Sequence, residues 1–187
     1  MRRRKLIAAA IVAAAAAATV AVLVPAAGSA PRASAVTVKV MDLGTKYTIN
    51  RSATDTMYFA PAVISIPSGQ TLTFEYGGKP SSEPHTMTIV PQEALPRTSA
   101  QIDNCTVCER YASGHLKNPK APPGPTNDIA HWTLNTGGAG FDGPGDSIAI
   151  EGPQHRSITV QVSAPAGTVL HFICAVHPWM QGTIKVT

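Results

Sequence analysis

A short segment near the C-terminal end of the 187-residue chain carries three side chains that bind soft metal ions. Residues 174–180 (CAVHPWM) contain the thiol of Cys174, the imidazole of His177 and the thioether of Met180. Copper takes this set when one Cys and two His lie in a plane and Met makes a long, weak bond. His85, which opens an alternating run, can supply the second imidazole. The sequence therefore predicts one copper ion bound by His85, Cys174, His177 and Met180.

Each of these residues has an ordinary explanation when it is taken alone. Cys174 would be a small buried apolar residue, Met180 would fill a core, and the histidines would be loop or strand-end residues. Two residues separate Cys174 from His177, and two separate His177 from Met180. This joint spacing is hard to obtain by chance. Cys174 is also the odd one of three cysteines, and a metal-bound thiolate is protected from pairing.

The elements that must position these donors are strands. Apolar and polar residues alternate with a period of two in several short runs, and Gly/Pro turns separate them. No long stretch has the 3.6-residue period of a helix. The expected strands are residues 36–40, 63–66, 72–76, 84–89, 157–162, 168–174 and 183–186. This pattern predicts an all-β domain, an antiparallel sandwich or barrel.

Residues 91–146 do not follow this pattern, because they are rich in Pro, Gly, Asn, Thr and Ala. So long a segment without strands is unusual inside a compact domain and indicates an insertion. A short helix is expected within residues 93–111. Other histidines are not expected to bind the copper: His131 lies beside Trp132, His155 in a turn, and His171 on the strand face opposite Cys174.

Cys105 and Cys108 in this insertion allow three interpretations. A local disulfide bracing the insertion is the ordinary one in an oxidising compartment. A second metal site with His115 is the alternative. A thioredoxin-like redox pair would need a surrounding βαβ pattern, which is missing, and a c-type haem site is excluded because Glu109 follows Cys108.

The first 35 residues have the order of a secretory signal. Arg2, Arg3, Arg4 and Lys5 precede an apolar stretch at 6–24, and small residues follow up to Ala35. The stretch is nearly long enough to span a bilayer, so an uncleaved anchor is the alternative. We expect export to the periplasm, the cell envelope or the medium. Without the leader the chain has 10 basic and 11 acidic residues, a formal net charge of −1, which leaves no basis for nucleic-acid binding.

The copper segment resembles the C-terminal ligand loop of cupredoxins, the small blue copper proteins that include plastocyanin and azurin. Its short spacing is similar to that of amicyanin, and Pro84-His85 matches the position of the first His ligand in the family. The resemblance covers residues 36–90 and 147–187, whereas small cupredoxins lack the insertion at 91–146. It implies an eight-stranded Greek-key β-sandwich and one-electron transfer between Cu(I) and Cu(II).

Three functions compete on these grounds. The first is electron carriage, in which a monomer would meet redox partner proteins near His177 and Trp179, with membrane contact only through a retained leader. The second is copper storage or delivery without redox turnover. A copper enzyme is disfavoured, because the sequence lacks the His-x-His pairs of multicopper oxidases and four ligands leave no position for substrate.

Overall fold

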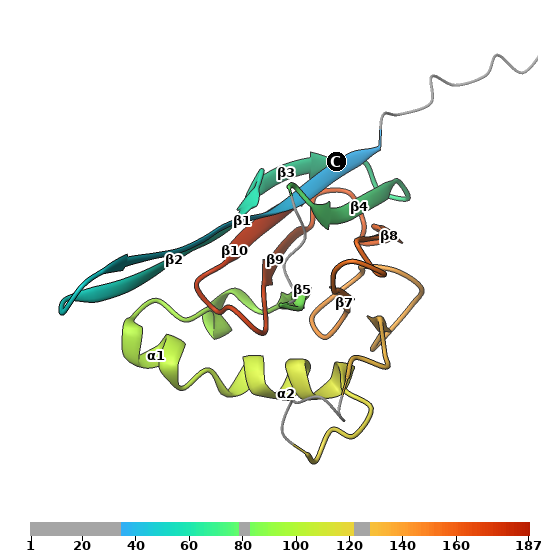
Figure 1. The fold of residues 1–187 in the computed structure, drawn as a ribbon. Coiled ribbons are helices and arrows are strands. Elements are labelled where there is room, and N and C mark those ends of the chain that lie inside the picture. The colour runs from blue at the N-terminus through green and yellow to red at the C-terminus, as the bar shows by residue number, and fades with distance from the viewer. Residues whose placement is uncertain (1–34, 79–82, 122–127) are drawn as a thin grey trace, which may run out of the picture. The chain divides into compact units, whose positions relative to one another are not determined.

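The computed structural model describes residues 35–78, 83–121 and 128–187, so that nearly all of the expected leader, residues 1–35, lies outside the described residues. Two β-sheets make up the architecture (Figure 1). The four-stranded sheet contains, in this order, β2 (Ser52–Ala60), β1 (Val36–Thr48), β4 (Thr71–Tyr76) and β8 (Ser157–Gln161). The six-stranded sheet contains, in this order, β3 (Val63–Ile66), β10 (Gln181–Val186), β9 (Val169–Ile173), β5 (His85–Val90), β7 (Ser147–Ile150) and β6 (Thr133–Leu134).

The predicted β-sandwich is confirmed, but the prediction that it is antiparallel throughout is wrong. β1 runs parallel to β4, and β3 runs parallel to β10. These partners are distant in sequence, because the chain crosses between the two sheets instead of returning beside the strand it has just left. A period-two pattern reports which face of a strand is buried and not the direction of its neighbour, so it could not reveal these pairs.

The structure also contains a long hairpin that the sequence pattern does not predict. β1 continues past residue 40 to Thr48 and pairs with β2, and the two form the extended ribbon in Figure 1. Asn50 turns the chain with a positive φ of 56°, which Asn tolerates better than most residues. Much of this hairpin is exposed on both faces, so its sequence lacks the apolar alternation that predicts a half-buried strand.

The core lies between the sheets and is built from the inward residues of both. Phe59 on β2 links the two sheets: its ring contacts that of Phe74 on β4 and that of Phe172 on β9, with centroids 6.0 and 5.1 Å away. Cys174 and Met180 belong to the same buried cluster. Two of the four predicted metal ligands are therefore part of the close-packed core.

The outer face of the six-stranded sheet is covered by part of the expected insertion. It contains η1 (Gln92–Ala94), α1 (Ser99–Asp103) and α2 (Thr106–His115), which we call the helical cover. Cys105, Cys108 and Tyr111 pack in a second buried cluster with Ile173 and Ala175. As a result every residue of β5 and β7 is buried, on both faces of the sheet.

Two expectations for residues 91–146 are decided by this arrangement. Helix is present as predicted, in two segments, and Cys105 forms a disulfide with Cys108. The alternative of a second metal site with His115 is wrong, because both sulfurs are consumed by the disulfide and His115 hydrogen-bonds to Ser147 and to the carbonyl of His131.

Residues 135–146 contain no named helix or strand and are ordered around one carboxylate. Asp146 is fully buried and accepts hydrogen bonds from the backbone N–H groups of Thr136, Asp142 and Gly143. Such bonds satisfy backbone groups that have no strand partner.

Among the described residues, no helix combines the length and apolar character needed to cross a membrane.

Candidate metal centre

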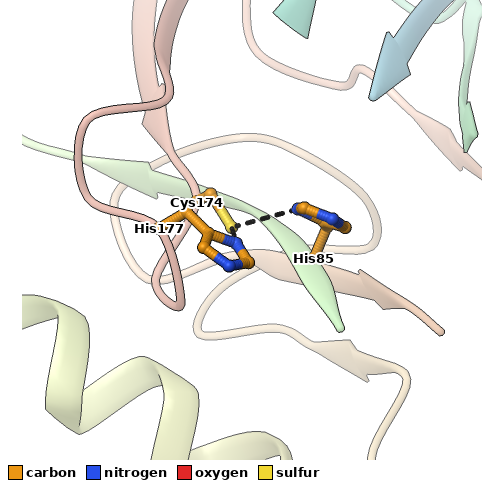
Figure 2. Close-up of side chains that lie close together, drawn as sticks. All are labelled: His85, Cys174 and His177. Carbon is orange, nitrogen blue, oxygen red and sulfur yellow. Dashed lines mark hydrogen bonds between the residues drawn. The ribbon is translucent and has the colours of Figure 1, made fainter. Parts of the chain in front are cut away.

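Three of the four predicted ligands converge in the structure. His85 is the first residue of β5, Cys174 follows the last residue of β9, and His177 lies in the loop before β10. Figure 2 shows their side chains pointing toward one another. The Nδ1 atoms of His177 and His85 lie 3.6 and 3.9 Å from the Cys174 sulfur. One donor atom from each residue lies within 4.8 Å of the others.

These separations fit a metal ion between the donors. In zinc sites, metal–sulfur and metal–nitrogen bonds are about 2.3 and about 2.0 Å, which at a trigonal angle places sulfur and nitrogen about 3.7 Å apart. The observed distances lie on either side of that value. One thiolate and two imidazoles are the donor set of a trigonal copper site. The cluster could therefore hold a copper ion, and it is the sole grouping of three His, Cys or carboxylate donors among the described residues.

The ligand loop is closed by its own backbone. The N–H of Cys174 donates to the carbonyl of Met180, and the N–H of Met180 donates to the carbonyl of His177, both at 2.9 Å. Met180 is 1% exposed and packs in the main core. The fourth predicted ligand is thus held in the same closed loop as Cys174 and His177, and its bond to copper stays a prediction.

The neighbouring histidines favour the thiolate form of Cys174. Burial raises the pKa of Cys174, but hydrogen bonds and charge interactions with His177 and His85 outweigh it and lower the pKa to about 5. The backbone N–H of Thr86 also donates to the sulfur at 3.4 Å. Since the thiolate is the form that binds metal, little free energy is needed to deprotonate this ligand at neutral pH.

Glu83 is a further residue of the candidate site, and the sequence did not predict it. Its carboxylate accepts a hydrogen bond from Nε2 of His177 at 3.0 Å, on the side of the ring away from Cys174. Burial lowers the pKa of His177, and the interactions with Cys174 and then Glu83 raise it above the usual value. A carboxylate on the distal nitrogen fixes the orientation of a ligating imidazole. Its only sequence signal is its place two residues before His85.

The imidazole of His177 is largely covered by its neighbours. His177 is only 7% exposed, although this still places it nearer the surface than His85 at 0%. Glu83 contacts its outer nitrogen and the Trp179 ring lies 5.2 Å away. The exposed apolar surface beside the site is formed instead by Trp179 and Val176, at 44% and 37%.

The remaining histidines lie outside the cluster, as expected. His171 is half-buried, whereas Leu170 and Phe172 on either side of it belong to the core. His155 stacks on Trp132 with ring centroids 3.8 Å apart. Neither ring belongs to the donor cluster.

Comparison with known proteins finds similar structures and no similar sequence family. No family model and no curated protein matches the chain. Auracyanin A, a blue copper protein from Chloroflexus aurantiacus, is 19% identical, with 70% of this chain and 89% of that chain covered and a TM-score of 0.40. Plastocyanin from Dryopteris crassirhizoma is 15% identical, with 71% and 91% covered and a TM-score of 0.35.

A purple cupredoxin from Nitrosopumilus maritimus is 14% identical, with 81% of this chain and 99% of that chain covered and a TM-score of 0.35. At this level of similarity the function of the present chain has to be argued from its own site.

Proposed function

We propose that this chain is a type 1 (blue) copper protein that carries single electrons between redox partners. His85, Cys174 and His177 would form the ligand plane, and Met180 the weak fourth bond. The observation that carries the proposal is the convergence of one buried thiolate and two buried imidazoles on an all-β frame. Copper, when bound, supplies a one-electron couple between Cu(II) and Cu(I).

The frame suits electron carriage because it restricts the ligands. Cys174 and His85 adjoin neighbouring strands, β9 and β5, which pair directly. Core residues pack on one side of this pair and the helical cover packs on the other. A site held in this way offers nearly the same geometry to both oxidation states. Its buried donors also leave no open position for a substrate, which favours a carrier over an enzyme.

His177 is the proposed route for electrons, since it is the ligand nearest the surface. Trp179, Val176 and Pro178 would form an apolar docking surface for a redox partner protein. Apolar surface of this kind suits a weak and short-lived contact. The proposal includes a monomer, and export directed by residues 1–35; its support is the basic, apolar and small-residue order of that segment.

Copper retention and electron self-exchange test carriage against storage. For a carrier, both the Cu(II) and the Cu(I) protein should keep their metal in the presence of a competing chelator, and self-exchange should be fast, because the buried frame changes little. Chelator competition by absorbance and self-exchange by NMR line broadening can be measured on one sample. Rapid loss of Cu(I) together with slow self-exchange would overturn the carrier proposal in favour of storage or delivery.

Replacing Met180 with glutamine tests the fourth ligand. Because the axial ligand tunes the potential, Met180→Gln should keep the blue colour and lower the reduction potential. Voltammetry of the variant beside the unchanged protein measures the shift. Met57→Gln is a control, since Met57 is also a buried methionine of the core but lies on β2. Equal potentials for Met180→Gln and the unchanged protein would exclude Met180 as a ligand.

A further inference from the structure

A continuous chain of buried polar side chains leads away from the metal centre under the helical cover. Thr86 accepts a hydrogen bond on Oγ1 from the N–H of Ala175, the residue after Cys174, at 2.7 Å. The hydroxyls of Thr86 and Thr88 lie 3.1 Å apart, and those of Thr88 and Ser147 lie 2.7 Å apart. Ser147 Oγ is in turn 2.7 Å from Nε2 of His115.

The strands and the cover build this chain together. Thr86 and Thr88 alternate on β5, so their side chains share the face opposite Met87 and Ile89, which pack in the main core. Ser147 is the register partner of Thr88 on β7. His115, the last residue of α2, comes from the cover. The four side-chain groups belong to residues that are at most 1% exposed: Thr86, Thr88, Ser147 and His115.

His115, at the outer end of this series of hydrogen-bonded side chains, fixes the direction of the hydrogen bonds. Nδ1 of His115 bonds to the carbonyl oxygen of His131, which can only accept, so Nδ1 must carry the proton. Burial lowers the pKa of His115, which keeps the ring neutral at neutral pH. In a neutral ring whose Nδ1 is protonated, Nε2 can only accept. Ser147 therefore donates to His115.

The remaining donors follow in order. Because the Ser147 proton points at His115, its oxygen is left to accept from Thr88. Thr88 then accepts from Thr86, whose oxygen accepts from the Ala175 N–H. Each hydroxyl donates once, in the direction away from Cys174. The same residue, Thr86, also donates its own N–H to the Cys174 sulfur.

We propose that His115 and Ser147 are positioning residues for the copper centre, acting through Thr88 and Thr86 on the backbone beside Cys174. The inference rests on the proposed copper function, and it assigns a role to residues 91–146: the cover supplies the histidine that completes the chain. If His115 were absent, the Thr86 hydroxyl would have no fixed direction, and the N–H groups of Ala175 and Thr86 would be held less firmly. Hydrogen bonds around the sulfur tune the potential of such a site.

The first test needs no copper. In the copper-free protein, ¹⁵N NMR should show His115 neutral with its proton on Nδ1. Ser147→Ala should accelerate hydrogen exchange at the Ala175 amide about tenfold, which matches the loss of about one hydrogen bond. Ser147→Thr, which retains a hydroxyl, should restore slow exchange. A proton on Nε2 of His115 in the unchanged protein would overturn the proposal, even if no variant folds.

The second test uses the copper-loaded protein. Ser147→Ala and His115→Phe should lower the reduction potential, because weaker hydrogen bonding leaves more charge on the sulfur to stabilise Cu(II), while Ser147→Thr should keep it. His131→Ala is the matched histidine control, since the groups of His131 that hydrogen-bond to His115 belong to its backbone, which the substitution keeps. If Ser147→Ala and His115→Phe had the same reduction potential and the same Ala175 exchange rate as His131→Ala, the proposal would be overturned. If the exchange results hold but the protein is colourless, the blue-copper function fails and the positioning chain stands.

Discussion

Cys174→Ala is expected to abolish the blue colour completely. The intense absorption of such a site comes from charge donated by the thiolate to Cu(II), and Cys174 is the sole free cysteine of the chain. Loss of groups that merely support metal ligands costs about 10–100-fold in affinity, so loss of a direct ligand should cost more than about 100-fold. Visible absorbance and copper titration of the variant measure both effects.

The disulfide provides a matched control for this experiment. A variant with Cys105→Ala and Cys108→Ala removes two buried sulfurs of the second cluster but no predicted ligand. It should remain blue when it is loaded with copper. A Cys174→Ala protein that is as blue as the unchanged protein would contradict the proposed site, and so would a colourless protein with one tightly bound copper.

Phe172→Ala is expected to lower the free energy of unfolding of the copper-free domain by about 3–5 kcal/mol, the usual cost of removing a buried aromatic ring. Phe172 is fully buried, and its ring packs against Phe59. Gly182 leaves room for this ring, because a Cβ there would fall 2.2 Å from Cζ of Phe172. Urea unfolding followed by tryptophan fluorescence measures the change.

Val169→Ala is the control on the same strand. Val169 is 51% exposed, so its truncation should change the free energy of unfolding by less than about 0.5 kcal/mol. If Phe172→Ala does not fold, Phe172→Leu keeps most of the apolar contact and should show a smaller loss. Equal effects of the truncations at Phe172 and Val169 would contradict the core described above.

The sequence predicted the donors better than it predicted their support. Cys174, His177 and Met180 share one loop, so their spacing was visible, and His85 marked the start of an alternating strand. Thr86 and Thr88 have the spacing of a solvent-exposed face, yet both are buried. They are buried because the helical cover packs over them. The cover comes from another part of the sequence, so no pattern within the strand predicts this burial.

The same limit applies to the topology and to Glu83. Strand pairs such as β1 with β4 depend on the path of the chain between sheets and not on the alternation within either strand. Glu83 precedes His85 by two residues but contacts the other imidazole, that of His177. Its role depends on how two loops meet, which a reading of the sequence one segment at a time cannot supply.

The sequence separation of the donors has a consequence for how the protein acquires its metal. His85 and Cys174 are 89 residues apart and meet only when β5 pairs with β9. Such non-local pairings form slowly, after a long loop has closed. The complete donor set therefore exists only in the native domain, so the proposed copper site would be complete only after folding. A metal that prefers the native state also shifts the folding equilibrium, by about 1.4 kcal/mol for each tenfold excess over its dissociation constant. Copper supply would thus influence the lifetime of the protein as well as its redox state.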